Sequence, residues 1–182
     1  MVLNNKPQMF TFYFPSNFWY EEVKTRWKPL VERMKLPYQD VADFMNQQVQ
    51  SVKFPAMNME LATQQRGQYD IAYYSGKELE PLIDKNITVT FKLTESYITY
   101  WIVWDQIDTF LHYASTYREK QPCWMEPVKM GFLTDAGFQL FEFTFYEITP
   151  TNTSELNMSY AATVASYNTF SLNLRYNYFD IN

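Results

Sequence analysis

Hydrophobic and polar residues alternate in several short runs of the chain, the pattern typical of half-buried β-strands. The clearest run is NITVTFKLT, where Ile87, Val89 and Phe91 share one face and threonines share the other. MFTFYFP alternates in the same way and ends at Pro15. Further strands are expected in VQSVKFP, QYDIAYY, VKMGFL and GFQLFEFTFYEI. The TDAG segment between the last two predicts a turn, with Gly137 free to adopt a positive φ.

The C-terminal segment shows the same alternation almost to the last residue. Apolar or aromatic residues occupy the even positions from Phe170 to Tyr178, and polar residues lie between them. We expect one continuous strand here, preceded by a crossover in TPTNTSELNMSY. The count is then seven or eight strands, mostly antiparallel. Such a sheet protects its edges by closing into a barrel or folding into a sandwich.

Two regions have a helical period instead. The first covers residues 16–47, where Ser16 or Asn17 is the expected N-cap and Glu21 and Glu22 lie near the positive end of the helix dipole. Because proline lacks an N–H group, Pro29 is expected to end this helix and begin a second short one. A third helix is expected from Pro37 or Tyr38 to about Gln47, with Val41, Phe44 and Met45 on one face.

The second helical region is TESYITYWIVWDQIDTFLHYAS, with Thr94 as its expected N-cap. Its apolar residues recur every three or four positions, and we expect this helix to be buried on more than one side. The residues of that face are Tyr97, Trp101, Trp104, Ile107 and Leu111. AMNMELATQQRG has no clean period and is expected to form a long loop or an extended arm.

Composition narrows the class of protein. The chain has 182 residues, enough for one domain with a core of its own. Its 19% aromatic content fits either an aromatic-rich core or surface buried both on folding and on assembly. A single cysteine excludes a disulfide within the chain. The net charge of −5 argues against tight binding of nucleic acid. No apolar run reaches the ~20 residues of a membrane span, and the first residues do not resemble a signal peptide. These features predict a protein made inside a cell and carried in a particle or kept soluble there.

Candidate chemistry is sparse. His112 is the one histidine, and a lone histidine on an aromatic helix is more often structural than catalytic. Cys123 matches no nucleophile motif, the four glycines form no phosphate-binding loop, and no cysteine or histidine cluster has metal-ligand spacing. Asp105 and Asp108 could act as an acid–base pair but better fit the polar edge of a helix. The basic residues Lys24, Arg26, Lys28, Arg33 and Lys35 are interrupted by glutamates, as on a solvated helix face. The sequence therefore predicts no enzyme, no cofactor and no metal site.

The C-terminal stretch resembles the signature of phage tail tube proteins. The matching pieces are the turn at Pro150–Asn152, the segment Glu155–Tyr160, and the final strand Tyr167–Asp180 with its aromatic–acidic ending. VQSVKFPAM resembles the second strand of that family, and the order of strand, helix and hairpin also fits. The resemblance covers about residues 48–182.

The resemblance implies an α+β fold that is mainly β, namely an antiparallel β-sandwich or barrel of tail-tube type with one flanking helix. It implies a single domain over residues 1–182 that assembles into a ring, a hexamer or larger, contacts other tail proteins and lets DNA pass without sequence-specific binding. The protein would lie in the virion tail after assembly in the host cytoplasm. The helical insert at residues 16–47 departs from the simple tube pattern, so a hub or baseplate ring is an alternative to the tube itself.

Several residues are candidates for contacts in such an assembly. Partner or ring–ring contacts are expected at Phe18, Trp19, Tyr20, Trp27, Asn58, Gln64 and Arg66, with the loop Ala56–Gly67 reaching between rings. The lumen face is expected at Asn173, Arg175 and Asn177, and the lumen itself is expected to be polar or acidic.

Two other functions stay open from the residues alone. One is a monomeric β-barrel module that binds a small apolar ligand in a closed cavity lined by Trp101 and Trp104. The other is a hydrolase with a degenerate site that uses His112 and Asp108.

Overall fold

The computed structural model describes residues 10–34, 40–55, 61–66, 69–74, 84–117, 123–134, 136–156 and 169–182. Within these residues the chain forms two four-stranded antiparallel sheets, a separate hairpin and three α-helices, so the expected α+β class, mainly β, is confirmed. Sheet A contains β1 (Phe10–Tyr13), β6 (Val128–Leu133), β7 (Gln139–Tyr146) and β10 (Tyr178–Ile181), in that order. Sheet B contains β2 (Val49–Lys53), β5 (Asn86–Lys92), β9 (Thr169–Arg175) and β8 (Thr149–Thr153).

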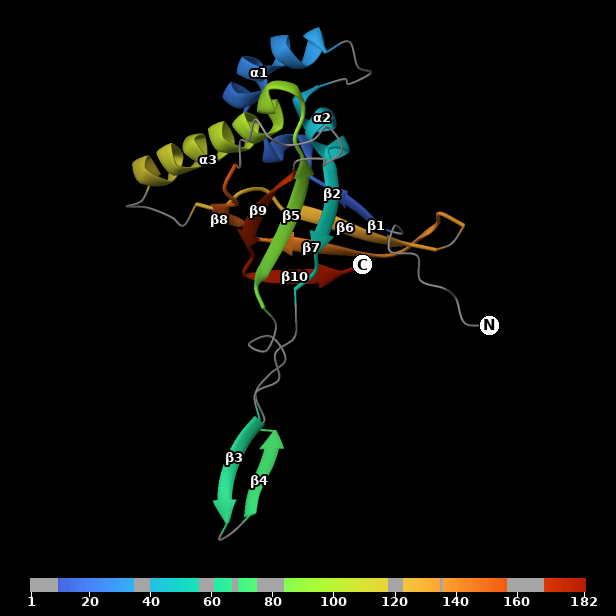
Figure 1. The fold of residues 1–182 in the computed structure, drawn as a ribbon, viewed down its shortest axis with the longest axis vertical. Coiled ribbons are helices and arrows are strands. Elements are labelled where there is room, and N and C mark those ends of the chain that lie inside the picture. The colour runs from blue at the N-terminus through green and yellow to red at the C-terminus, as the bar shows by residue number, and fades with distance from the viewer. Residues whose placement is uncertain are drawn as a thin grey trace, which may run out of the picture.

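The two sheets pack face to face with their strands crossing. In Figure 1 the strands of sheet A run across the view behind the upright strands of sheet B. The alternation read from the sequence decides which side chains meet between them: Ile87, Val89 and Phe91 of β5 are buried, as are Phe170, Leu172 and Leu174 of β9. Phe91 and Phe170 stack with ring centroids 5.3 Å apart. The predicted faces of these two strands are therefore confirmed.

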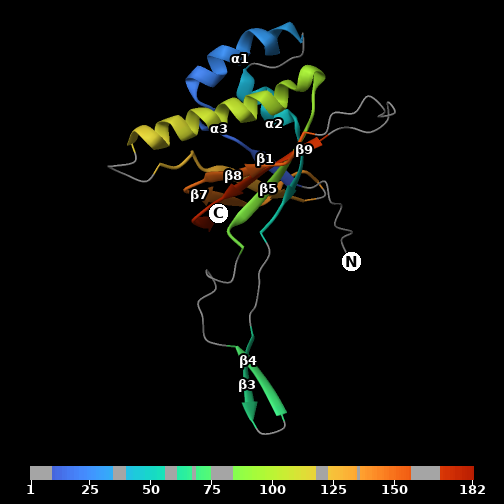
Figure 2. The same cartoon turned by 60° about the vertical axis from the view of Figure 1, so that its left-hand side comes forward.

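Three helices cover one end of the sandwich (Figures 1 and 2). They are α1 (Glu21–Arg33), α2 (Val41–Gln47) and α3 (Ile98–Tyr117). α2 begins at Asp40, whose carboxylate accepts a 2.8 Å hydrogen bond from the Asp43 N–H, and it ends at the expected Gln47. α3 begins after a 3-10 turn (Glu95–Tyr97), so the helix proper starts four residues beyond Thr94.

The prediction for the first helix was wrong in two respects. Ser16 and Asn17 lie in a short 3-10 turn (Ser16–Phe18), and the residue that precedes α1 is Tyr20, which makes no side-chain cap bond. Pro29 does not break α1, which continues to Arg33. Pro29 and Thr25, the residue one turn earlier, are both exposed, so water can bond the Thr25 carbonyl that the proline leaves unpaired.

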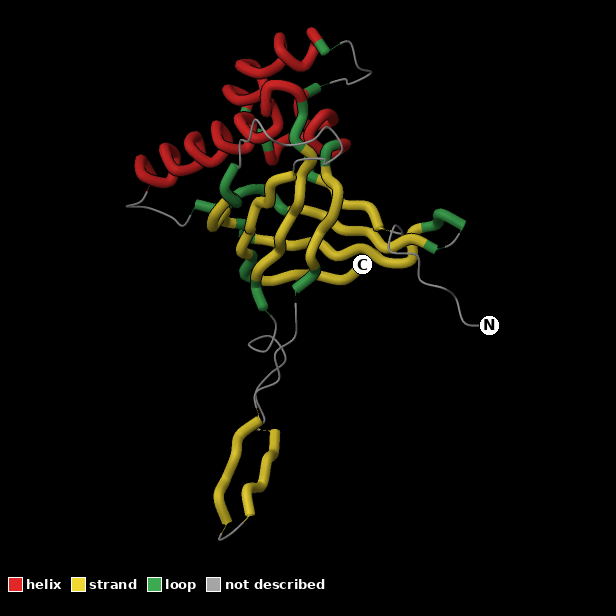
Figure 3. Tube along the Cα trace, in the orientation of Figure 1, coloured by secondary structure: helices red, strands yellow, loops and turns green. Residues whose placement is uncertain are grey.

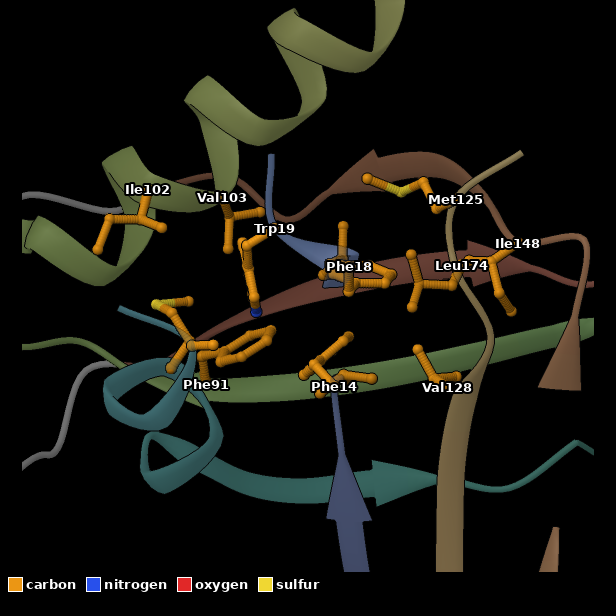
Figure 4. Packing of buried hydrophobic residues seen from close by; sticks show 14 of the residues in the cluster. Phe14, Phe18, Trp19, Phe91, Ile102, Val103, Met125, Val128, Ile148 and Leu174 are labelled. Carbon is orange, nitrogen blue, oxygen red and sulfur yellow. The ribbon is translucent and has the colours of Figure 1, made fainter. Parts of the chain in front are cut away.

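The segment between β1 and α1 fills the centre of the core. Phe14, Phe18 and Trp19 are buried, and the Phe14 ring lies 4.7 Å from Phe18 and 5.9 Å from Phe91. Figure 4 shows Trp19 beside Val103 of α3. Side-chain amides replace the missing strand partners of this segment. Asn46 bonds both the N–H and the carbonyl of Phe14, at 2.9 and 3.0 Å, and the buried Gln106 bonds Tyr20 N and Phe18 O.

The C-terminal segment forms two strands, not the expected one. The chain leaves sheet B after Arg175, turns at Tyr176 and Asn177, and enters sheet A as β10. The turn is fixed by hydrogen bonds from Tyr176 N to Lys85 O at 3.0 Å and from Asn177 N to Tyr146 O at 3.2 Å. Alternation continues through the turn because Tyr176 is buried between the sheets, so the pattern does not reveal the change of sheet.

Two further expectations were corrected by the strands. β8 occupies Thr149–Thr153, where a crossover was expected, and pairs with β9. AMNMELATQQRG contains β3 (Leu61–Arg66), which pairs with the predicted strand β4 (Tyr69–Tyr74) in a hairpin that stands away from the sandwich (Figures 1 and 3). The β6–β7 hairpin was predicted correctly, with Gly137 at φ 82° in its turn.

We predict that stability falls at high pH through the buried Tyr176. Burial, with the nearby Asp84 charge, raises the pKa of Tyr176 to about 12, whereas an unfolded tyrosine ionises near pH ~10. The stabilisation is therefore complete below pH ~10 and is lost as pH rises towards 12. Tyr176→Phe should weaken this dependence, measured by urea unfolding across that range. Tyr178→Phe, at an exposed position two residues on, is the control, and equal slopes in both variants would contradict the assignment.

Candidate assembly interface

The outer face of sheet B is a polar surface whose side chains bond one another across strands. Thr88 Oγ1 donates to Asn173 Oδ1 at 2.6 Å, and the Thr90 and Ser171 hydroxyls lie 3.3 Å apart. Asn173 Nδ2 also donates to Asn152 Oδ1 on β8. The face thus presents hydroxyl and amide groups that hydrogen-bond one another across neighbouring strands.

The charges on sheet B are all positive. Its four strands contain Lys53, Lys92 and Arg175 and no aspartate or glutamate. Arg175 and Asn173 lie on β9 as predicted, but Asn177 lies beyond the strand and donates to Glu147 Oε2 at 2.6 Å. Asn177 is therefore not part of this polar face, because the chain has already turned towards sheet A.

Sheet B has two open edges, β2 and β8. In the part of the chain that the structure describes, each has a neighbouring strand on one side only. Each is also irregular, with a register shift between Val49 and Ser51 in β2 and between Pro150 and Asn152 in β8. Bulges and prolines restrict unwanted pairing at strand edges. These edges can accept another strand over a short length, but backbone pairing there supplies limited free energy.

α3 flanks the open edge at β8 and exposes an aromatic face towards solvent. Trp101, Trp104 and Leu111 are 43%, 52% and 57% exposed. The expectation that α3 is buried on more than one side was wrong: its buried face carries Thr99, Ile102, Val103, Gln106 and Phe110. Large apolar residues lie on both faces of this helix, so the sequence period does not say which face enters the core.

A groove lies between this face of α3 and β8. It has a volume of about 250 Å³ and is lined by Trp104, Ile107, Asp108 and Leu111 of the helix and by residues 150–153 of the strand. We call it the α3–β8 groove. A closed cavity lined by both Trp101 and Trp104 was the expectation for a ligand-binding module. The groove instead is open to solvent, and Trp101 does not line it.

α1 packs against α3 through a polar seam. The partly buried Asp105 accepts hydrogen bonds from Arg26 and, at 2.8 Å, from Trp27 Nε1. Tyr113 donates to Glu22 at 2.6 Å, and this bond lowers the pKa of the Glu22 carboxyl. Asp105 thus holds the helical cap in place, as the expected polar edge of α3, whereas Asp108 lines the groove. His112 and Asp108 are exposed on α3.

The expected partner contacts fall in three different environments. Phe18 and Trp19 are 2% and 1% exposed, so the expectation of exposed aromatic anchors there is corrected: the crossed sheets and α3 already cover them. Tyr20 and Trp27 are half-buried in the α1–α3 seam. Gln64 and Arg66 lie on β3, and Asn58 lies outside the described residues.

Sequence reasoning missed a second apolar surface at the β6–β7 turn. Phe138 and Leu140 are 73% and 65% exposed, and Phe141 beside them is also exposed. These residues belong to the run GFQLFEFTFYEI, which was predicted to form a long strand. The signal that could have located them is the position of two large apolar residues directly after a turn glycine, where a half-buried strand does not require them.

No group of three or more histidine, cysteine or acidic side chains is placed to hold a metal in the described part of the chain. Among its helices, none has the length and apolar character needed to cross a bilayer.

No family model and no curated protein matches the chain. Solved structures that overlap with it include a subunit from the baseplate of the anti-feeding prophage, at 11% identity and a TM-score of 0.45, over 74% of this chain and 78% of that one. A subunit from the sheath/tube terminator of an extracellular contractile injection system overlaps at 12% identity and a TM-score of 0.43, over 74% and 84%. Hcp1 from Flavobacterium johnsoniae overlaps at 12% identity and a TM-score of 0.33, over 73% and 84%. TM-scores below 0.5 do not establish a common fold.

We predict that two tryptophans differ sharply in their contribution to the stability of the isolated subunit. Trp19→Ala should lower the free energy of unfolding by about 3–5 kcal/mol, because it empties a fully packed site. Trp104→Ala, made on the exposed face of α3, should change it by less than about 1 kcal/mol. Chemical denaturation of dilute protein measures both. A loss at Trp104 as large as that at Trp19 would mean that α3 is packed on both sides within one chain.

Proposed function

We propose that this chain is a structural subunit of a bacteriophage tail, in the tube or in a tube-like hub or baseplate ring, and that rings of it form the conduit for DNA ejection. The proposal rests on the resemblance of the C-terminal stretch to tail tube proteins. The structural observation that carries it is sheet B, which has two open edges and an outer face of mutually bonded polar groups.

Strand direction favours closure through copies of this sheet. Neighbouring strands of sheet B are antiparallel throughout, so β2 and β8 at its two edges run in opposite directions. Rotation about a ring axis therefore brings β2 of the next copy antiparallel to β8, with no strand in conflict. A closed ring leaves no open edge in this sheet. Six four-stranded sheets would form a wider barrel than those of ~16–18 strands, which already leave an aqueous channel.

The lumen of such a ring would be lined by the outer face of sheet B. Its threonine, serine and asparagine side chains are neutral, and its charged groups are Lys53, Lys92 and Arg175. The expected acidic lining thus has no support in these strands. Neutral groups that bond one another offer a passing duplex few sites of attachment, and contacts of the three cations with phosphates would weaken with salt.

We predict that the purified protein assembles into rings with a central hole. Light scattering should give a mass several times the 21.8 kDa of one chain, and negative-stain electron microscopy should show annular particles or short tubes. A monomer of 21.8 kDa at every concentration tested would contradict the proposal. That result would favour a ligand-binding module instead, since the α3–β8 groove would then stay open in the working protein.

The β3–β4 hairpin is the candidate for contacts between stacked rings. It pairs within itself and stands away from the sandwich, and it includes the expected contact residues Gln64 and Arg66. β2 and β5 are adjacent antiparallel strands, so residues 56–83 can be replaced by a short Gly-Ser linker without separating them. We predict that this variant forms rings that do not stack into tubes, as seen by electron microscopy. Tubes of normal length from the shortened chain would show that stacking uses another surface.

A further inference from the structure

Two exposed apolar surfaces lie on opposite sides of the sandwich. One is the α3–β8 groove with Trp104 and Leu111, beside one open edge of sheet B. The other is the β6–β7 turn, with Phe138 and Leu140. This turn projects at the right-hand side of Figure 1, opposite the end of α3. Exposed clusters of large apolar residues on a soluble domain indicate interaction surfaces. Their different shapes, a groove and a protruding turn, suit contact with each other.

The crossing of the two sheets makes the β6–β7 turn overhang the other open edge. Phe54, which directly follows β2, contacts Phe132 and Phe143 with ring centroids 6.1 and 5.0 Å apart. These two residues therefore lie beneath the β2 edge, and the residues nearer the turn extend beyond it (Figure 3). At the opposite end of sheet A, Ile148 pairs with Met125 immediately before β8 begins. Sheet A thus extends past β2 at one end and is continuous with the start of β8, the strand that lines the groove, at the other.

The turn holds Phe138 in a defined position. Thr134 N donates to the Phe138 carbonyl at 2.7 Å, and the Thr134 hydroxyl accepts from Phe138 N at 3.0 Å. Gly137 closes the turn with a 2.9 Å bond to Thr134 O. A backbone that is already held by hydrogen bonds loses less conformational freedom on docking, which favours affinity. The groove of about 250 Å³ can admit a phenyl ring, since a cavity of about 150 Å³ holds benzene.

We propose that the β6–β7 turn of each subunit docks into the α3–β8 groove of the next subunit, with Phe138 as the anchor. This inference rests on the proposed ring, and it names the contact that supplements the short, irregular pairing between β8 and β2. When β2 of a neighbouring subunit lies along β8, the β6–β7 turn of that neighbour extends past its own β2. The turn then lies under the inner side of β8, at the α3–β8 groove. The contact joins two different surfaces, so it is head-to-tail and covers both in every subunit of a closed ring.

Cysteine cross-linking tests the contact in the full chain. In a Cys123→Ser background, Leu111→Cys and Phe138→Cys together should give disulfide-linked ladders of two, three and more subunits after mild oxidation. Each single cysteine alone should give no ladder. The matched control pairs Leu111→Cys with Tyr13→Cys, since Tyr13 is exposed on the outer face of sheet A and away from the β6–β7 turn. A ladder from the control pair equal to that of the test pair would overturn the inference.

A charged residue at position 138 gives a second test, in which the concentration needed for ring formation is measured. Phe138→Asp should raise the concentration at which rings form by at least about 30-fold, the loss expected for a buried aromatic anchor, without altering the fold of the monomer. Rings that form normally in Phe138→Asp, or rings of the cysteine pair that give no ladder, would overturn the docking and leave the ring proposal standing. Absence of rings in the unmodified protein would overturn both.

Discussion

Among the residues that the structure describes, the two outer strands of sheet B, β2 and β8, each pair with a neighbour on one side only, and much of the proposed behaviour of the molecule depends on how those edges are satisfied. An isolated four-stranded sheet can leave its edges to water, but here both edges are short and bulged, and one carries Pro150. These features limit indiscriminate pairing. They also mean that an ordered neighbour must be held by contacts outside the sheet. The exposed aromatics of α3 and of the β6–β7 turn lie where such contacts would form.

The high aromatic content of the chain has two separate structural causes. One set of rings fills the space between the crossed sheets, where Phe14 contacts Phe12, Phe18, Trp19 and Phe91. The second set lies on the surface, at Trp101, Trp104 and Phe138. The helical segment at residues 16–47 contributes to this core. Its buried residues include Phe18, Trp19, Phe44 and Met45. The segment closes one end of the sandwich and is an integral part of the domain.

Periodicity in the sequence predicted β5 and β9 best, because each of these strands has one buried face and one face that is not buried. It placed Ile87, Val89 and Phe91 correctly and located the β6–β7 turn at Gly137. Periodicity failed where the same sequence pattern is compatible with two different structures. The alternation through Tyr176 continues from β9 into β10, because the turn residue is itself buried between the sheets. A proline was taken as a helix end, yet Pro29 lies on the solvent side of α1. The assembly surfaces were harder to predict, because the apolar faces of α3 look equivalent until the sheets decide which is covered.

Hydrogen–deuterium exchange of the edge strands tests the central claim most directly. Backbone amides of β2 and β8 should exchange fast at concentrations where the protein is monomeric, and slowly where it is assembled, approaching the protection of the central strands β5 and β9. Fast exchange at β2 and β8 in assembled particles would contradict joining of sheet B between neighbouring subunits.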